Sequence, residues 1–314
     1  MSTLVHAHPS PIPLPRFTPE TMGLALGLTA AGIWGAYLAM ARAGISSGLG
    51  APEIAVFRYG VAGLVMLPWL LRHGPLHLAG IGWRRASVLA LLAGPLFVLI
   101  GAGGYRFAPL AHGAVVQPAA LTLSAMLAAW LMFGERLSSA RIAGMVAIIG
   151  GLAVIAGPGL LSGGQTAPIG DAMFAVAGMM WAAFAILSKR WGVNPVAATA
   201  VVSVLSALAY VPLYAFVVGF DRLAATPAAV LLPQIVVQGV LSGVVAVMAF
   251  ARAVQLVGTS RAAVFPALVP ASAIMLGWPI AGEVPTLLQA IGLGLVTGGL
   301  LISVGLFRRR GGLG

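Results

Sequence analysis

Charged side chains inside long apolar stretches are the residues of this sequence best placed to do chemistry. Arg58 lies within the apolar stretch 53–72, and Arg252 lies within the stretch 231–256. A charge inside a lipid bilayer is costly, so each of these residues is a candidate for function. The planar guanidinium of arginine binds a carboxylate through paired N–H groups, so Arg58 could hold the carboxylate of a solute. Arg58 could instead snorkel to the headgroups or contact Glu53, and snorkelling would account for Arg252 as well.

Aromatic and amide side chains in other apolar stretches could line the cavity that such a solute needs. Gln117 and Phe265 each precede a proline, Pro118 and Pro266, in segments of similar sequence. A proline inside a helix removes one backbone hydrogen bond, and the freed carbonyl is tolerated in a membrane only against protein or water. We therefore expect the two prolines to act as kinks or hinges in a cavity wall, although simple packing would also account for them. The predicted substrate-binding residues are Trp34, Tyr37, Arg58, Tyr105, Gln117, Trp181, Phe184, Gln238 and Phe265.

The acidic residues are informative because there are only six, and none falls at the middle of an apolar stretch. A proton-coupled exporter of lipophilic cations would need a buried acid that binds cation and proton in turn, so the sequence favours facilitated diffusion or exchange. Glu135 and Glu283 are instead expected to bond helix ends and loop amides. Because there is no cysteine, no intramembrane histidine and aspartate cluster and no nucleophile motif, the sequence predicts no metal site, no cofactor and no enzyme activity.

The composition shows which kind of element must position these residues. Hydrophobic residues make up 60% of the chain and charged residues only 7%, against roughly 25% in soluble domains. A water-soluble surface cannot be built from so few charges, so the chain must lie in a lipid bilayer, where a helical span needs about 20 apolar residues. The net charge of +11 does not indicate nucleic acid, because the basic residues lie at the ends of apolar stretches rather than on one soluble face. The predicted spans are residues 21–43, 53–72, 86–106, 111–133, 141–158, 170–190, 195–218, 231–256, 261–281 and 287–307.

A long segment of the chain occurs twice. Residues 113–157 align without a gap with residues 261–305, and 14 of the 45 positions are identical. The matches include Trp130 with Trp278, which composition alone would rarely place at one fixed offset, so we interpret the pattern as an internal duplication. The predicted divisions are a disordered tail at 1–20, a first five-helix repeat at 21–158, a linker at 159–169, a second five-helix repeat at 170–307 and a basic tail at 308–314.

Basic residues are unequally divided between the two ends of the predicted spans. If the amino terminus is cytoplasmic, the inner segments hold twelve basic residues and the outer segments hold only Arg42, Arg106 and Arg222. Cytoplasmic loops of membrane proteins carry such an excess of lysine and arginine. A five-helix unit has an odd number of spans, so its second copy must be inverted. The sequence therefore predicts an all-α polytopic membrane protein with ten transmembrane helices in two inverted five-helix repeats, a plan that recurs in secondary transporters.

The chain resembles the EamA-type family of the drug/metabolite transporter superfamily over about residues 21–307. The resemblance rests on the ten spans in two halves, on Trp34 and Trp181 in the first helix of each half, on the Gly-Glu pairs 134–135 and 282–283, and on glycine-rich fifth helices. It implies a ten-helix bundle with both termini cytoplasmic, a central cavity and alternating access. Members of the family export amino acids and other small metabolites, and the YddG-type exporters move aromatic amino acids.

We therefore expect a transporter that moves a small metabolite, for example an amino acid, out of the cell across the inner or plasma membrane. The alternatives are a proton-coupled multidrug or nucleobase exporter of the same superfamily and, from another class, a membrane-embedded enzyme. The expected partners are a small-molecule solute and the lipid bilayer, with no nucleic acid. Glycines of the fifth and tenth spans, such as Gly294 and Gly298, are expected to pack helices closely, and the chain is expected to be a monomer or a weak homodimer.

Overall fold

The computed structural model describes residues 18–133, 138–161 and 166–303. Within these ranges the regular elements are all helices, and no strand occurs. Seven helices or continuous runs of helices are long and apolar enough to cross a membrane, and three shorter apolar helices complete the set. The prediction for Glu135 falls outside the described residues.

Each half of the chain supplies five membrane-crossing segments, some of them built from several helical pieces. The elements of the first half are α1 (Pro19–Ser46), α2 (Ala51–Val56), η1 (Phe57–Val61), α3 (Ala62–Arg72), η2 (Pro75–His77), α4 (Trp83–Ala93), α5 (Pro95–Gly103), η3 (Gly104–Arg106), α6 (Leu110–Phe133) and α7 (Ser139–Leu161). The elements of the second half are α8 (Ala167–Arg190), α9 (Pro195–Val217), α10 (Asp221–Ala225), α11 (Ala228–Gln234), η4 (Ile235–Val245), α12 (Ala246–Val257), α13 (Thr259–Ala262), α14 (Val264–Ala267), α15 (Val269–Ala281) and α16 (Leu287–Ser303).

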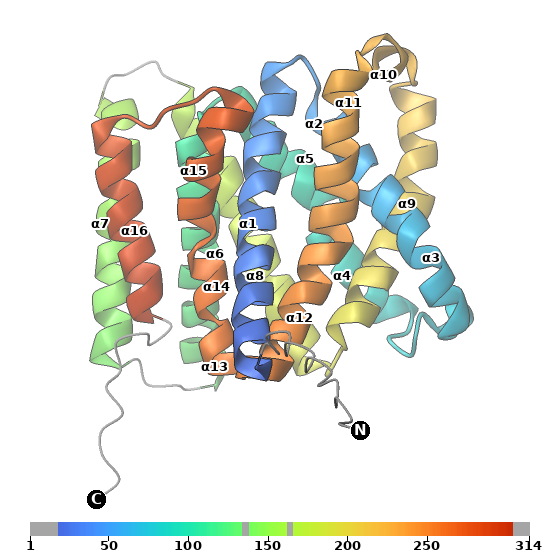
Figure 1. Cartoon of the computed structure of the whole chain (residues 1–314), viewed down its shortest axis with the longest axis horizontal. Helices are drawn as coiled ribbons and strands as arrows, with labels where there is room; N and C mark the ends of the chain where they lie inside the picture. The colour runs from blue at the N-terminus through green and yellow to red at the C-terminus, as the bar shows by residue number, and fades with distance from the viewer. Residues whose placement is uncertain (1–17, 134–137, 162–165, 304–314) are drawn as a thin grey trace, which may run out of the picture.

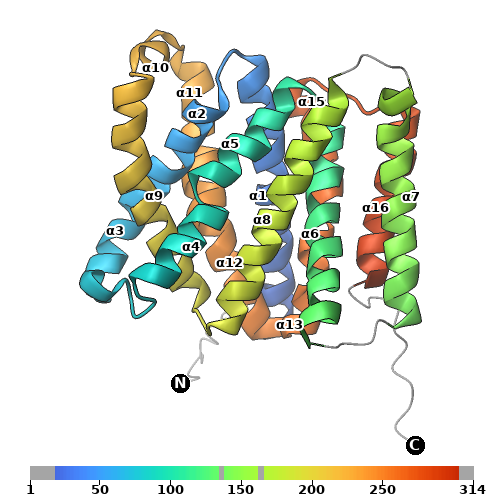
Figure 2. The same ribbon diagram turned by 180° about the vertical axis from the view of Figure 1, so that it is seen from behind.

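Successive segments run in opposite directions, and the two halves are inverted relative to each other. Helix α1 begins at the lower edge of the molecule in Figure 1, and α16 ends at the same edge. Helix α8, the first segment of the second half, runs in the opposite direction to α1 (Figures 1 and 2). The ten segments lie within a few residues of the predicted spans. The predicted fold class, an all-α polytopic membrane protein with two inverted five-helix repeats, is therefore confirmed.

The two edges of the bundle differ in charge. We call the edge at which α1 begins the basic edge, and it also holds the end of α3, the start of α4, the end of α8 and the short helix α13 (Figures 1 and 2). The other edge, here called the opposite edge, holds the loop between α1 and α2 as well as α10. The described basic residues near the basic edge are Arg72, Arg84, Arg85, Arg141, Lys189, Arg190 and Arg261, and those near the opposite edge are Arg42, Arg106 and Arg222.

Packing between the halves follows the internal symmetry. Helix α1 packs against α15 and α12, and its counterpart α8 packs against α6 and against α4 and α5. Each first helix thus contacts the third and fourth segments of the other half. Helix α3 packs against its counterpart α9, and α7 packs against its counterpart α16. The shared interior of the bundle is therefore built mostly from contacts that join one half to the other.

The third segment is bent between α4 and α5, at Gly94 and Pro95. A Cβ atom at Gly94 would lie 2.0 Å from the carbonyl oxygen of Ala90, so only glycine fits this bend. Pro95 has no N–H group, and the interruption frees carbonyl groups at the end of α4. The hydroxyl of Tyr59 donates to the carbonyl oxygen of Ala93 at 2.6 Å, which satisfies one of them inside the bundle.

The two prolines predicted to kink equivalent helices behave differently. Pro118 lies inside the unbroken helix α6, whereas the segment that holds Pro266 is divided into α13, α14 and α15. The second copy has a further proline, Pro270, four residues after the first, where the first copy has Thr122. Two prolines in successive turns remove two backbone hydrogen bonds, which explains why only the second copy is broken. Their role as hinges stays a prediction.

Helices α7 and α16 form a closely packed pair at one side of the bundle (Figure 1). A Cβ atom at Gly151 would lie 2.7 Å from the carbonyl oxygen of Gly292, and one at Gly299 would lie 2.7 Å from the carbonyl oxygen of Gly144. Small residues allow this close approach of two membrane helices. The glycines named from the sequence are not the ones involved, because Cβ atoms at Gly294 and Gly298 would meet nothing within 4 Å.

Candidate solute-binding site

Arg58 is a buried cation at the contact between the two halves. Its Nη1 donates to the hydroxyl of Ser242 at 2.8 Å, and its guanidinium carbon lies 4.6 Å from the ring centre of Tyr37 and 5.8 Å from that of Tyr59. Only 7% of Arg58 is exposed, so the side chain does not snorkel into the headgroups. Nor does it contact Glu53, and in the described ranges no carboxylate lies within ion-pair distance of it. Cation–π contacts and one hydrogen bond therefore stabilise this charge in place of an acid.

Two irregular helical pieces bring Arg58 and Ser242 together. Arg58 lies on the π-helical turn η1 and Ser242 on the π-helical stretch η4, and these two stretches pack against each other. The absence of a side chain at Gly239 allows the two backbones to approach closely. A Cβ atom at this position would lie 2.7 Å from the carbonyl oxygen of Phe57. Gly243 packs in the same way, since a Cβ atom there would lie 2.9 Å from that of Ala62. Short π-helical stretches are rare in proteins, and those that occur are often located at functional sites.

A pair of buried amides continues this cluster toward α1. Gln234 Nε2 donates to the carbonyl oxygen of Met40 at 2.6 Å, and Gln238 Nε2 donates to that of Tyr37 at 3.2 Å. Gln238 Nε2 also lies 3.4 Å from Gln234 Oε1. The remaining oxygen, Gln238 Oε1, is buried without a hydrogen-bond partner. An unpaired buried acceptor costs about 1–3 kcal/mol, so this atom is a candidate for contact with a ligand.

Aromatic pairs of corresponding helices flank α1 and α8. The ring of Trp34 on α1 lies 5.4 Å from that of Phe250 on α12. The ring of Trp181 on α8 lies 5.1 Å from that of Phe97 on α5 and 5.2 Å from that of Phe184. Each first helix therefore places its tryptophan against a phenylalanine from the third segment of the other half. All of these rings except Phe97 are only partly buried.

The other predicted residues lie elsewhere in the bundle. Tyr105 is buried on η3, with its ring 4.8 Å from that of Phe174 and its hydroxyl unpaired. Gln117 lies on α6 where this helix packs against α8, and its Oε1 would be 3.6 Å from a Cβ atom at Gly101 on α5. Phe265 packs against Gly27 of α1, where a Cβ atom would overlap the phenylalanine ring. The structure thus joins Tyr37, Arg58 and Gln238 through direct contacts, and among the described residues Tyr105, Gln117 and Phe265 make no hydrogen bond or ring contact with these three.

Glu283 connects three segments near the opposite edge. Its carboxylate accepts hydrogen bonds from the guanidinium of Arg42 on α1 and from the backbone N–H of Leu110, the first residue of α6, the latter at 2.8 Å. Arg42 also donates to the carbonyl oxygen of Tyr105. The prediction that Glu283 bonds a helix end is therefore confirmed. The interaction joins α1 and α6 of the first half to the second half.

One buried acid and one partly buried acid were not singled out as functional candidates in the sequence. Glu53 is completely buried at the start of α2, where it accepts from the backbone N–H of Gly50 at 2.7 Å and from the hydroxyl of Tyr214 at 3.1 Å. His112 Nδ1 lies 2.9 Å from Asp171 Oδ1 between α6 and α8. Both groups lie near helix starts, which agrees with the absence of acids from the middle of the spans.

Sequence reasoning also missed Ser242 and Gln234, although a signal was present. These two residues and Gln238 are spaced at intervals of four residues, and residues 228–251 are otherwise apolar. Such spacing places polar side chains on one face of a helix. Tyr59 had no comparable signal, because a single tyrosine in an apolar span is ordinary.

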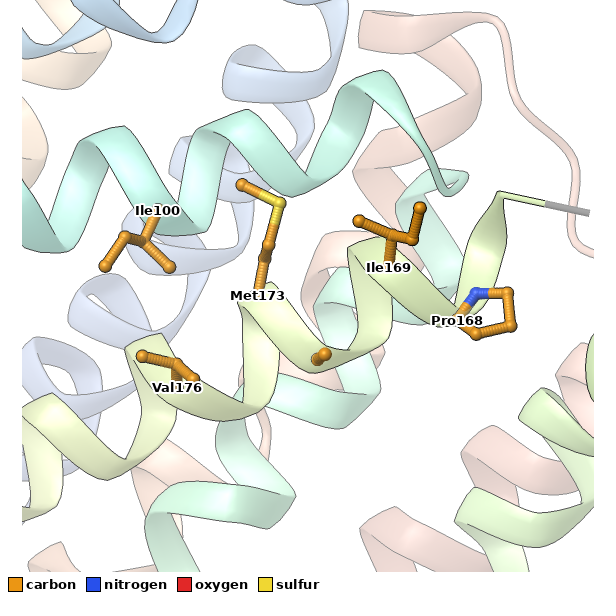
Figure 3. A pocket seen from close by; sticks show the side chains of 6 residues that line it. Ile100, Pro168, Ile169, Met173 and Val176 are labelled. Atoms are coloured by element: carbon orange, nitrogen blue, oxygen red, sulfur yellow. The ribbon is translucent and has the colours of Figure 1, made fainter.

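Two cavities lie away from the Arg58 cluster. A groove of about 550 Å³ between α5 and α8 is lined by apolar side chains, among them Ile100, Met173 and Val176 (Figure 3). It offers no side chain that could bind a polar solute. A smaller cavity of about 280 Å³ near the opposite edge is lined partly by Arg106 and Arg222.

Comparisons with known proteins agree with this architecture. The family model described as "EamA-like transporter family" matches residues 21–157 and again residues 168–305. A solved structure titled "Crystal structure of protein" is similar over 92% of this chain and 99% of its own, with a TM-score of 0.60 and 19% sequence identity. At that identity the likeness shows the fold alone. A search of curated proteins gives no match.

Proposed function

We propose that this chain, which belongs to the EamA-like transporter family, carries a small metabolite with a carboxylate group along the contact between its two halves. The observation that carries the proposal is Arg58, a buried cation that faces no acid among the described residues. An ionisable residue inside a membrane bundle typically marks the path of a substrate. Inverted-repeat transporters bind their substrates where the repeats meet.

The chemistry of Arg58 favours a carboxylate. A guanidinium has five N–H groups, and one hydrogen bond to Ser242 uses one of them. The rings of Tyr37 and Tyr59 stabilise the charge without neutralising it. A carboxylate would supply both the missing charge and two aligned acceptors. The aromatic groups around Trp34 and Trp181 would provide apolar walls for the rest of the solute, and amino acids are the first solutes to test.

Access to this site requires a conformational change. Arg58, Gln238 and Ser242 are buried in this conformation, so a solute reaches them only when the packed halves move apart. The π-helical contact between η1 and η4 is where we propose this movement to occur, since irregular helix leaves backbone bonds that can rearrange. Alternation between two such arrangements would expose the site to each side of the membrane in turn.

We further propose that the basic edge faces the cytoplasm. Lysine and arginine are in excess there, as they are in the cytoplasmic loops of membrane proteins. This orientation would place the start of α1 and the end of α16 on the cytoplasmic side of the inner or plasma membrane. Transport out of the cell is the direction that family resemblance favours.

Flux into liposomes tests the proposal. Purified protein is reconstituted, and uptake of a labelled panel of amino acids and small carboxylic acids is measured for the native chain, Arg58→Lys, Arg58→Ala and Arg252→Ala. Arg252 is the matched control, because it is exposed on α12 and bonded only to Gln255 among described residues. Truncating one partner of a buried charge pair costs about 2–5 kcal/mol, so Arg58→Ala should lower flux at least roughly tenfold.

The control and the lysine variant make the result specific. Arg252→Ala should keep flux within about twofold of the native chain, since exposed side chains contribute little. Arg58→Lys should retain part of the flux, because it keeps the charge and loses the paired N–H geometry. Equal flux per folded molecule for Arg58→Ala would remove Arg58 from the site, and no flux with any carboxylic acid would reject the substrate class.

A further inference from the structure

Gln238 is a buried residue whose hydrogen bonds the packing of the bundle leaves incomplete. Its side chain has no exposed surface, and its Oε1 atom has no hydrogen-bond partner, while its Nε2 atom donates to the carbonyl oxygen of Tyr37. Buried polar groups are almost always paired in folded proteins. A buried acceptor without a donor, in the same cluster as a buried cation without an acid partner, indicates a site that is completed by a ligand.

The orientation of this amide is fixed by its neighbours. Gln234 Nε2 donates to the carbonyl oxygen of Met40, which leaves Gln234 Oε1 facing Gln238. Gln238 therefore faces two oxygen acceptors, Gln234 Oε1 and the carbonyl of Tyr37, and both require its N–H groups. A flipped amide would set oxygen against oxygen. Gln238 Oε1 is consequently the end of the amide chain, with no donor left for it among the described side chains.

Gln238 and Arg58 both contact Tyr37. The backbone carbonyl of Tyr37 accepts from Gln238, and the ring of Tyr37 lies under the guanidinium of Arg58. Ser242, which accepts from Arg58, follows Gln238 by four residues on η4, so both side chains lie near the same face of this stretch. The cluster thus contains one acceptor without a donor and one cation without an anion, joined through Tyr37.

We propose that Gln238 is a specificity-determining residue, whose Oε1 accepts an N–H group carried by the solute next to its carboxylate. This inference rests on the proposed function, in which Arg58 holds the carboxylate. The solute would then be a carboxylic acid with a protonated amine close to the carboxyl carbon, and not a simple organic anion.

Matched ligands test the proposal. Binding of L-leucine and of 4-methylpentanoate, which differs only by the missing amino group, is measured by calorimetry on purified protein, and L-phenylalanine and 3-phenylpropionate form a second pair. Sites that hydrogen-bond a substrate group strongly reject the analogue that lacks it. We expect the native chain to bind at least one amino acid at least roughly tenfold more tightly than its partner acid.

Variants assign that preference to one side chain. Gln238→Leu should weaken binding of the amino acid alone, because the lost acceptor contacts only the amino group. The two affinities of a pair should then lie within about twofold of each other. Gln255→Leu is the matched control, because Gln255 lies on the neighbouring α12 and contacts Arg252, and it should leave the preference unchanged. Arg58→Ala should weaken both members of the pair.

The outcomes separate this inference from the proposed function. If Arg58→Ala weakens both ligands but Gln238→Leu leaves their ratio unchanged, the role of Gln238 is wrong and the carboxylate site stands. If Arg58→Ala changes neither ligand, the proposed function fails. Should Gln238→Leu not fold, the native chain still decides the matter with N,N,N-trimethyl-leucine, which keeps the charge and lacks N–H groups. Binding as tight as that of leucine would overturn the proposal, and binding roughly tenfold weaker would support it.

Discussion

Arg58 shows what a single residue in the sequence can and cannot reveal. A charge in an apolar span is conspicuous, so the sequence singled out Arg58 without knowledge of its surroundings. Its hydrogen-bond partner, Ser242, is 184 residues away, and nothing in either local sequence indicates that the two side chains meet. The contact depends on Gly239, whose missing side chain lets η4 approach η1. The sequence therefore predicts the charged group of the site but not the neighbours that define it.

The carboxylate of Glu283 should stabilise the opposite edge of the bundle. Glu283→Gln removes the charge that holds Arg42 and the N–H of Leu110, so we expect a lower melting temperature of the purified protein. Glu20→Gln is the control, because the pair of Glu20 with Arg261 is exposed on both sides and such pairs contribute little. Equal melting temperatures for the two variants in a fluorescence-based thermal scan would show that the Glu283 interaction is not stabilising.

At the scale of elements, the sequence predicts where helices lie better than how they are interrupted. Apolar length sets the spans, and the observed segments agree with them within a few residues. The π-helical stretch η4 carries no proline in residues 235–245, so no local signal marked it. The bend at Gly94 and Pro95 could have been predicted, because a Gly-Pro dipeptide marks an interruption of regular structure, but the predicted spans did not take it into account.

The close packing of α7 against α16 predicts that substituting a glycine between the two helices lowers the melting temperature more than substituting one on the outer face. Gly151→Leu places a side chain against the backbone of Gly292, and such overpacking typically costs about 1–3 kcal/mol, so the protein should melt earlier. Gly294→Leu is the matched control on the outer face of α16, where a Cβ atom meets nothing within 4 Å. Thermal scans of both variants in detergent check this. If Gly294→Leu were the more damaging change, that face would be an interface, as a homodimer would require.

For the whole molecule, the sequence predicts the inverted arrangement because duplication and charge are both visible in it. An odd number of spans per copy requires inversion, and the excess of arginine and lysine marks one edge. Which helices meet is not visible, since α1 packs against α12 and α15 of the other half, more than 200 residues away in the chain. The site is built from these long-range contacts, which the sequence does not show. This is why only three of the nine predicted residues contact one another in the polar cluster around Arg58.

The absence of cysteine gives a direct test of orientation. Leu76 and Val284 are both highly exposed, at 79% and 71%. Leu76 lies on η2, between the end of α3 and the start of α4 at the basic edge, and Val284 lies between α15 and α16, which meet at the opposite edge (Figure 1). In intact cells, a membrane-impermeant maleimide should label Val284→Cys and spare Leu76→Cys, because we place the basic edge in the cytoplasm. Permeabilised cells should label both. Labelling of Leu76→Cys alone in intact cells would reverse the proposed orientation.

The accessibility of Ser242 tests the central claim, that a solute passes along the contact between two inverted halves at Arg58. Ser242 is completely buried in this conformation, so a cysteine there can react only when the halves separate. In liposomes of fixed orientation, impermeant maleimide should label Ser242→Cys slowly when added to either side, and a transported solute should slow the labelling. Gly294→Cys, on the outer face of α16, should stay unlabelled. If Ser242→Cys is labelled from neither side while the same liposomes transport the solute, the route lies elsewhere and the claim is contradicted.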